Sequence, residues 1–309
     1  MPYISKDFIV DKPVKAWTFL VHELGFSMRE AQRAIDRKQL LQNGEIVKRK
    51  SDTVSKIVTL LVYEPRPKGL LPVYENEFFA VFNKPSGVLT HPRSRITDYS
   101  LNDEIKYRYG KNANVVHRLD KETSGLIIVS KSKEYENELK KLFSNREVEK
   151  KYKALVRGRI DEEMKIDAPI LINRDFVAIK TKVCINKNGA HALTEIKPLK
   201  YFEEIDATLV HVTPRTGRQH QIRVHLFHVE HSIIGDPLYG VNTKMATMYL
   251  DGQMDVKSRI KFTGSERLLL HADELKFEYR GEEYSFKSKI DIESEFITFA
   301  AAIKKHIHD

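Results

Sequence analysis

Cysteine is almost absent from this chain. Its 309 residues include a single cysteine, Cys184, which cannot form a disulfide within the chain. One thiolate also excludes a structural zinc site built from a cysteine cluster. A chain without internal disulfides fits a protein of the reducing cytoplasm.

Long apolar runs are missing too. No stretch approaches the roughly 18 consecutive apolar residues that a membrane-spanning helix needs. The start, Met1 to Asp7, lacks the basic residues, apolar core and small-residue cleavage site of a signal peptide. We therefore expect a cytoplasmic protein that has no membrane partner.

Motifs for nucleotides, dinucleotides and metals are absent as well. The sequence has no glycine-rich phosphate loop, no dinucleotide fingerprint and no His-Glu-x-x-His. Four histidines gather at His220, His225, His228 and His231. Only His225 and His228 would be neighbours on a helix, and no acidic residue at matching spacing completes a ligand set. We expect no metal and no cofactor.

Positive charge, by contrast, is abundant. The chain has 52 Lys and Arg residues against 43 Asp and Glu, a net charge of +9. Such an excess suits a polyanionic partner because Lys and Arg neutralise phosphates and release counterions, although charge also serves solubility. Many basic residues crowd into one part of the sequence: Lys131, Lys133, Lys140, Lys141, Lys150, Lys151, Lys153, Arg157 and Arg159. This clustering favours binding to nucleic acid.

The beginning of the chain reads as a small α+β domain over residues 15–64, preceded by an extension over residues 1–14. Ser27 and Glu30 predict the start of a helix with a capping box. Asn43-Gly44 predicts a tight turn between two short strands.

The rest of the chain predicts a larger α+β domain. Residues 65–73 contain two prolines and a glycine, which indicates a linker. Over residues 74–292, short β-branched runs such as Leu126–Ser130 alternate with helical patterns such as Lys133–Asn145. This mixture predicts one large mixed or antiparallel sheet with flanking helices. Residues 293–309 are expected to form a C-terminal helix.

The most informative stretch is His117-Arg118-Leu119-Asp120-Lys121-Glu122-Thr123-Ser124-Gly125, which runs directly into an apolar segment. The Thr-Ser pair and the glycine are typical of a turn. Asp120 is therefore expected on a loop held by a sheet, where catalytic groups are common. An Asp in a turn can also merely accept backbone hydrogen bonds, so local chemistry leaves both roles open.

The string His-Arg-Leu-Asp-x-x-Thr-Ser-Gly-Leu resembles the active-site signature of the RluA-type RNA pseudouridine synthases. Five further segments resemble motifs of that family in the same order: Asn83–Val88, Lys150–Ala154, Thr216–Leu226, Gly235–Gly240 and Leu270–Ala272. The resemblance extends over residues 74–280. Residues 15–64 resemble the alpha-L domain, an RNA-binding domain first described in a ribosomal protein.

This resemblance implies an isomerase that detaches a uracil from its sugar, rotates it and rejoins it through carbon 5, without a cofactor. It assigns Asp120 as the nucleophile or electrostatic partner and Arg223 as the cation that keeps Asp120 ionised. Tyr152 would stack on the target base and return about 1–3 kcal/mol of the cost of unstacking it. Without the resemblance, Arg223 could serve a phosphate or a surface ion pair, and Tyr152 could be a core residue.

The resemblance also implies RNA as the partner. We expect six residues to bind it: Arg118, His117, Arg218, His220, Leu270 and Lys84. Large-subunit (23S) ribosomal RNA is the favoured substrate because an N-terminal domain of this kind is common among such enzymes, and transfer RNA is the alternative. The modified uridine is not readable from the sequence, and we expect a monomer.

Two other functions stay open at this stage. An RNA-binding or ribosome-assembly factor could use the same basic surface without catalysis. A hydrolytic enzyme could pair Asp120 with Glu122, although glycosidases need two carboxyl groups about 5–9 Å apart across the substrate. No segment of the sequence suggests a sugar platform, so the hydrolytic alternative has little support.

Overall fold

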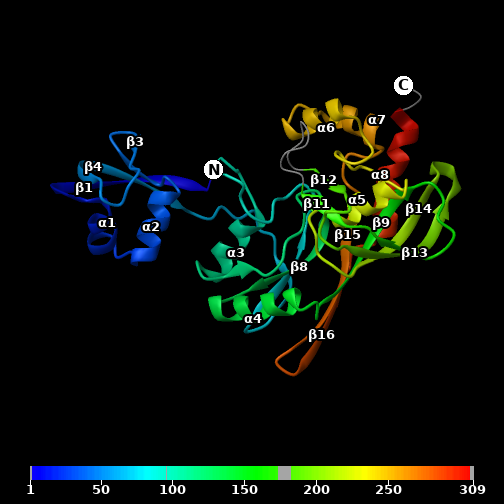
Figure 1. Cartoon of the computed structure of the whole chain (residues 1–309), viewed down its shortest axis with the longest axis horizontal. Helices are drawn as coiled ribbons and strands as arrows, with labels where there is room; N and C mark the ends of the chain where they lie inside the picture. Colours follow the sequence, from blue (N-terminus) through cyan, green and yellow to red (C-terminus); the bar gives the residue numbers. More distant parts are fainter. Residues whose placement is uncertain (1, 95, 173–181, 307–309) are drawn as a thin grey trace. The chain divides into compact units, whose positions relative to one another are not determined.

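The computed structural model describes residues 2–94, 96–172 and 182–306, with side chains up to residue 300. The chain divides into two compact units. The first comprises Met1–Lys68 and Pro92–Tyr107, and the second comprises Gly69–His91 and Arg108–Asp309 (Figure 1). The domain boundaries drawn from the sequence stay predictions. No helix in the described part of the chain is long and apolar enough to cross a membrane.

A four-stranded antiparallel sheet forms the frame of the first unit, in the order β1-β4-β2-β3. Its strands are β1 Tyr3–Lys15, β2 Leu40–Gln42, β3 Glu45–Ile46 and β4 Thr53–Tyr63. The helical segments are α1 Ala16–Thr18, a π-type turn at Phe19–Glu23 and α2 Met28–Asp36. Their apolar side chains share one buried cluster with the sheet. Residues 1–14, expected as an extension, thus contain almost all of strand β1.

Two local predictions for this unit are confirmed. Ser27 caps α2, and the Glu30 side chain accepts from the Ser27 backbone N–H in return, which completes the capping box. Asn43 and Gly44 connect β2 and β3 with φ angles of 51° and 81°. Positive φ at both positions is what a two-residue hairpin turn requires.

The second unit is built on a ten-stranded mixed sheet. The main path is β10 Met164–Asp167, β13 Leu193–Phe202, β14 Ala207–Pro214, β9 Glu149–Arg157, β15 Leu270–Tyr279, β8 Ser124–Ser130, β6 Phe79–Lys84 and β5 Pro72–Glu75. Strand β16 Glu282–Lys287 pairs with β15, and β7 Asn114–Val115 pairs with β8. Strands β8 and β15 are parallel, while the other pairs are antiparallel. The predicted α+β class with a large mixed sheet is confirmed.

Helices and short segments flank this sheet. They are α4 Lys133–Ser144, β11 Ile170–Ile172, β12 Val183–Ile185, a 3-10 turn at Glu203–Ile205, α5 Gln221–His228, α6 Thr243–Leu250, α7 Val256–Thr263 and α8 Ile292–His306. Helix α3 Leu101–Tyr109 belongs to the first unit through Tyr107. The helix predicted over residues 133–145 is confirmed. The predicted C-terminal helix corresponds to α8, and residues 307–309 lie outside the described residues.

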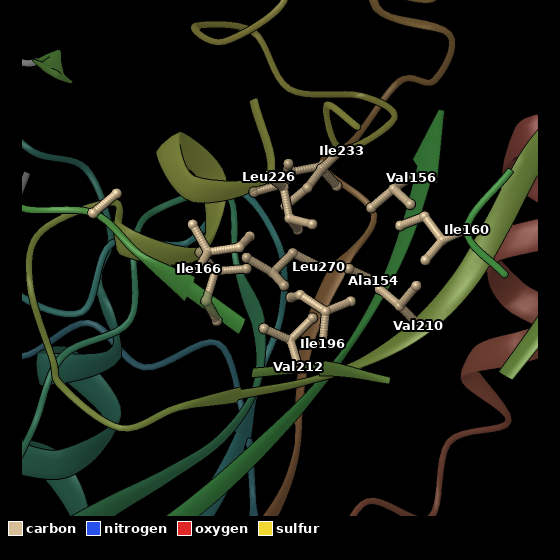
Figure 2. Packing of buried hydrophobic residues seen from close by; sticks show 13 residues of the cluster. Ala154, Val156, Ile160, Ile166, Ile196, Val210, Val212, Leu226, Ile233 and Leu270 are labelled. Atoms are coloured by element: carbon tan, nitrogen blue, oxygen red, sulfur yellow. The ribbon is translucent and has the colours of Figure 1, made fainter. Parts of the chain in front are cut away.

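A buried aliphatic cluster joins the sheet to α5 (Figure 2). Ala154, Val210 and Leu270 contribute from three neighbouring strands, and Leu226 contributes from the helix. Burying each large aliphatic side chain contributes about 1.5–3 kcal/mol. Tyr152 packs against the same cluster, so the aromatic residue predicted at the site rests on a rigid base.

Gly125 allows two parallel strands to come together directly after the Asp120 loop. It pairs with Ala272 of β15 and has a φ of +117°. A Cβ atom at this position would collide with the Ala272 backbone, with its Cα only 2.7 Å away. The glycine of the Thr-Ser-Gly motif is therefore needed for strand packing.

Candidate active site

Asp120 lies on the loop between β7 and β8, as the sequence predicts. Two hydroxyl groups hold this loop from the β6 side. Thr90 Oγ1 donates to the Leu119 carbonyl at 2.9 Å, and Ser86 Oγ donates to the Glu122 carbonyl at 2.6 Å. The backbone on both sides of Asp120 is therefore fixed, while its side chain remains 28% exposed.

Arg223 on α5 is the nearest cation to Asp120. Its side chain is only 3% exposed, and its Nη1 donates to Asp120 Oδ2 at 3.1 Å. Nε and Nη2 donate to the two carboxylate oxygens of Asp236, each at 2.7 Å. Burial opposes the charge on Arg223, but Asp236 and Asp120 raise its pKa above the usual value. One permanently charged guanidinium is thus shared by two carboxylates.

Asp236 is itself immobilised. Its Oδ1 accepts from the backbone N–H groups of Leu238 at 2.8 Å and Tyr239 at 3.0 Å. The Tyr239 ring lies 5.2 Å from the Arg223 guanidinium carbon, within the range of a cation–π contact. Sequence reasoning placed Asp236 in a family motif but gave it no role, because nothing local reveals its partner on α5.

Asp120 is held ionised by its surroundings. Burial alone would raise the pKa of its carboxyl, but His220 and Arg223 together lower it below the ordinary value. His220 Nε2 lies 3.8 Å from Asp120 Oδ2, and its other ring nitrogen is 3.2 Å from the Tyr239 hydroxyl. His220 adopts a left-handed backbone with φ of 53° at the start of α5. Such strained residues gather at functional sites.

Tyr152 on β9 completes the group of three predicted catalytic residues. Burial and the Asp120 charge raise the pKa of its phenol, so it stays neutral. Its ring packs on the aliphatic cluster. Among the residues that the structure describes, nothing forms a hydrogen bond with its hydroxyl, which leaves that group available to a substrate.

These side chains line one pocket of about 660 Å³, within the usual range for a ligand site. All predicted site residues except Lys84 take part: His117, Arg118, Asp120, Tyr152, Arg218, His220, Arg223 and Leu270. Lys150, which the sequence analysis placed among the clustered basic residues, also lines the pocket, whereas Phe143, Arg146 and Arg215 are lining residues that it did not single out. They lie next to the matched motifs, and that proximity was the available signal.

Comparison with known proteins agrees with this geometry. The profile of the RNA pseudouridylate synthase family matches residues 79–228. An RNA pseudouridine synthase of Helicobacter pylori (strain ATCC 700392 / 26695) is 40% identical, over 93% of this chain and 94% of its own length. The chain belongs to the RluA-type RNA pseudouridine synthases. It is an isomerase that converts uridine to pseudouridine in RNA.

Two further relatives of the synthase carry names that specify an RNA. The tRNA pseudouridine synthase C of Vibrio parahaemolyticus serotype O3:K6 (strain RIMD 2210633) is 34% identical, over 73% of this chain and 92% of its own length. The ribosomal large subunit pseudouridine synthase C of Buchnera aphidicola subsp. Baizongia pistaciae (strain Bp) is 33% identical, over 66% of this chain and 61% of its own length.

The arginine motif of the synthase supports Arg223 through Gln221. The Gln221 side-chain oxygen accepts from Thr216 Oγ1 at 2.7 Å and from the Arg218 backbone N–H at 3.0 Å. Its amide nitrogen donates to Thr194 Oγ1 at 3.0 Å. The loop before α5 is thereby tied to strand β13, which sets the position of the first helical turn.

Among the histidines that the structure describes, His225 has a structural role. Buried His225 bonds Thr194 Oγ1 at 2.8 Å and the Ala168 carbonyl at 2.9 Å. Within the described residues, no group of three or more His, Cys, Asp or Glu side chains could hold a metal ion.

Lys84 lies outside the pocket. Its fully buried ammonium group donates to the carbonyls of Pro85, Val88 and Lys121 at 2.9, 2.8 and 3.1 Å. Burial lowers the pKa of Lys84 to about 7, against the opposing charges of Glu122 and Asp120. Its contacts tether the Asp120 loop, and they leave no donor directed at RNA in the pocket.

His117 lines the pocket as a neutral ring. Its Nε2 accepts from the Ile128 backbone N–H at 3.0 Å, and its ring stacks on Phe143 with centroids 4.4 Å apart. Burial and then Lys150 lower the pKa of His117 to about 3. It therefore shapes the pocket wall without adding charge.

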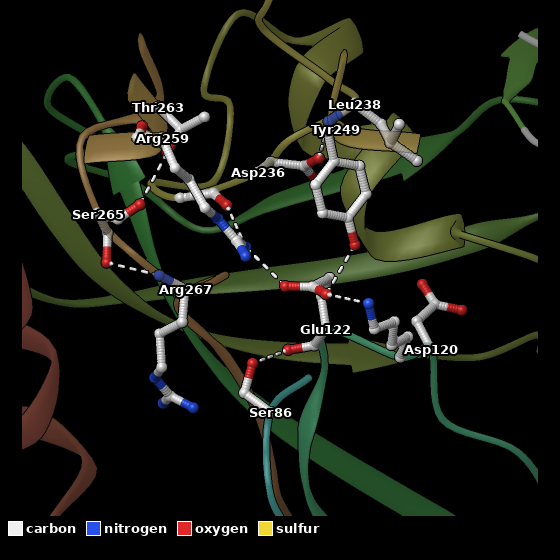
Figure 3. A network of polar contacts seen from close by, with 12 residues as sticks. Ser86, Asp120, Glu122, Asp236, Leu238, Tyr249, Arg259, Thr263, Ser265 and Arg267 are labelled. Carbon is white, nitrogen blue, oxygen red and sulfur yellow. Dashed lines mark hydrogen bonds and ion pairs between the residues drawn. The ribbon is translucent and has the colours of Figure 1, made fainter. Parts of the chain in front are cut away.

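Glu122 of the synthase binds Tyr249 and Arg259 (Figure 3). Its buried carboxylate accepts from Tyr249 Oη and Arg259 Nη2, each at 2.6 Å. Burial alone would raise its pKa, but Arg259 and Tyr249 lower it below the usual value. Because Glu122 does not line the pocket, it cannot face Asp120 across a substrate, and a hydrolytic carboxylate pair has no support.

Proposed function

We propose that Asp120 is the catalytic carboxylate of the synthase, Arg223 the cation that keeps it ionised, and Tyr152 the ring that faces the target base. One observation carries this proposal: an ionised carboxylate, a locked guanidinium and a neutral phenol meet in one pocket. Breaking the glycosidic bond of uridine needs a charged group beside the sugar or the base. Asp120 supplies this charge.

The sharing of Arg223 supports this role. Arg223 donates two hydrogen bonds to Asp236 and one, at 3.1 Å, to Oδ2 of Asp120. The other carboxylate oxygen of Asp120, Oδ1, accepts no hydrogen bond from the described residues and is free to approach the substrate. Arg223 therefore keeps Asp120 ionised without fully neutralising it.

Tyr152 and Leu270 would bracket the flipped base. The Tyr152 ring offers a stacking surface, and its neutral hydroxyl can exchange a hydrogen bond with the base. Leu270 is a buried residue of the same pocket and would exclude water from the base. Both residues rest on the aliphatic cluster of Figure 2, so little of their mobility is lost on binding.

The substrate we propose is large-subunit ribosomal RNA. The similarity to a relative named for the large ribosomal subunit supports it, as does a separate N-terminal unit with an exposed basic helix. Helix α2 presents Arg29 and Arg33 to solvent, followed by Arg37. Transfer RNA is the second candidate, supported by the relative named tRNA pseudouridine synthase C.

Pseudouridine mapping of total RNA tests both the activity and the substrate. Cells lacking the gene would be complemented with wild type or with Asp120→Asn. We expect particular uridines of the large-subunit RNA to lose modification and only wild type to restore them. Loss confined to transfer RNA would replace the first substrate by the second, and restoration by Asp120→Asn would refute the catalytic role.

A further inference from the structure

One wall of the pocket carries two neighbouring cations that no carboxylate neutralises. Arg146 follows the end of α4, and Lys150 lies on β9 two residues before Tyr152. Within the described residues, neither side chain forms an ion pair with an acidic group. Lys150 Nζ lies 6.0 Å from the centroid of the Phe143 ring.

Two other arginines that line the pocket differ. Arg215 Nη2 lies 2.6 Å from Glu195 Oε2, and Arg218 Nε donates to the His191 carbonyl at 3.0 Å. These two guanidinium groups already have acceptors for their hydrogens. Arg215 thus has a carboxylate partner and Arg218 a carbonyl acceptor, whereas Arg146 and Lys150 have no acidic partner among the described residues.

The arrangement is electrostatically unfavourable without a ligand. Lys150 is partly buried, and burial and then the charge of Arg146 lower its pKa. Both effects disfavour the charged ammonium group, and a bound anion would offset both. A buried or half-buried charge normally has a partner, so the missing partner here points to a ligand.

The backbone at Arg146 supports the same conclusion. Helix α4 ends with two reverse hydrogen bonds, from Arg146 N–H to the Phe143 carbonyl at 3.3 Å and from Glu147 N–H to the Leu142 carbonyl at 2.8 Å. This pattern puts Arg146 in the left-handed region, with a φ of 64°, at the position where helices prefer glycine. An arginine here strains the backbone but carries a charged side chain into the pocket.

The spacing along β9 suits a nucleotide. Side chains two residues apart on a strand point to the same face, about 7 Å apart. Lys150 and Tyr152 are related in this way, and both line the pocket. A base on Tyr152 would thus have a backbone phosphate within reach of Lys150 and Arg146.

We propose that Arg146 and Lys150 form a phosphate site for the RNA backbone beside the flipped uridine. This inference rests on the proposed function of the pocket and adds its anion-binding wall. The two cations would hold the RNA backbone next to the target nucleotide. The flipped base would therefore enter the pocket in one orientation.

The test measures binding of a short fluorescent oligouridylate to the full chain between about 50 and 200 mM salt. For a single strand, each neutralised phosphate contributes about 0.7 to the slope of log affinity against log salt concentration. The double variant Arg146→Gln/Lys150→Gln should therefore lose about that much slope and bind more weakly. Lys197→Gln is the matched control, because it removes an exposed cation of the same unit that pairs with Glu163.

Lys150→Arg separates charge from packing. It keeps the cation and should retain the wild-type slope, whereas Lys150→Gln should not. A double variant that matches Lys197→Gln in slope and affinity would overturn the inference, as would equal losses in Lys150→Arg and Lys150→Gln. Pseudouridine formation by the wild-type enzyme is measured in a separate assay. Lack of conversion there would refute the proposed function, whereas the salt dependence of binding tests the phosphate site alone.

Discussion

Among individual side chains, Arg223 has the central position because two carboxylates divide its hydrogen bonds. Asp236 binds the guanidinium in a bidentate manner and is fixed by two backbone N–H groups. Asp120 receives the remaining nitrogen. Asp236 is therefore a positioning residue: it orients the Arg223 guanidinium, which in turn helps to keep Asp120, the proposed catalytic carboxylate, ionised.

Asp236→Asn should destabilise the protein strongly. Breaking a buried ion pair by removing one partner costs about 3–5 kcal/mol because the remaining charge is left uncompensated. Asp120 still contacts Arg223, so we expect a loss of about 3 kcal/mol in the free energy of unfolding, the lower end of that range. Urea unfolding measures it, with Asp161→Asn as the control, since that carboxylate is 66% exposed in its pair with Arg159. Equal stability of the two variants would contradict the assigned geometry.

The pH dependence follows from the lowered pKa of Asp120. A carboxylate whose pKa falls on folding contributes stability that is complete above its unfolded value, about 3.9, and is lost as the pH falls through the lower folded value. Catalysis that needs the carboxylate should share this lower limit. We expect kcat/KM to show no loss from protonation of Asp120 down to about pH 4. Circular dichroism at each pH checks that the enzyme stays folded. An acid limb with a midpoint near pH 6 in the folded enzyme would contradict this expectation.

Among the elements, strand β8 connects the Asp120 loop to the sheet. It is buried along its whole length and pairs with β6, β7 and β15. Its parallel contact with β15 brings the Asp120 loop beside Leu270 at the start of that strand. The close approach at Gly125 makes this contact possible.

Gly125→Ala should therefore cost more than an ordinary glycine substitution. Gly125 and Gly87 both have positive φ, +117° and +80°, but a Cβ at Gly87 meets nothing within 4 Å. Gly87→Ala should lose about 1 kcal/mol from backbone strain alone. Gly125→Ala adds a collision with the Ala272 backbone, for which overpacking costs of about 1–3 kcal/mol are typical. Urea unfolding measures the free energy of unfolding of both variants. An equal loss in the two would show that β8 and β15 can separate freely.

Across the whole molecule, the sequence predicts the fold class and several local features well. The apolar run after Gly125, the pattern of α4 and the capping box at Ser27 depend on neighbouring residues, and the structure confirms them. Strand β1 was missed because Val10 is its one fully buried side chain. Its pairing with β4, about 40 to 60 residues later, creates the strand.

The site was predictable only in part for the same reason. Asp120, Tyr152 and Arg223 meet through tertiary structure, so their association came from the family resemblance and not from spacing. Nothing near Asp236 in the sequence indicates that it binds Arg223. The left-handed backbone of Arg146 likewise has no local signal, because arginine has no preference for that conformation.

The most direct test of the account is pseudouridine formation by purified Asp120→Asn on unmodified ribosomal RNA transcripts, quantified by mass spectrometry. We predict no conversion above the enzyme-free level, with RNA affinity within a few-fold of wild type, because a carboxylate contributes little attraction to phosphates. Conversion by the variant, or a large loss of its RNA affinity, would contradict the catalytic role of Asp120.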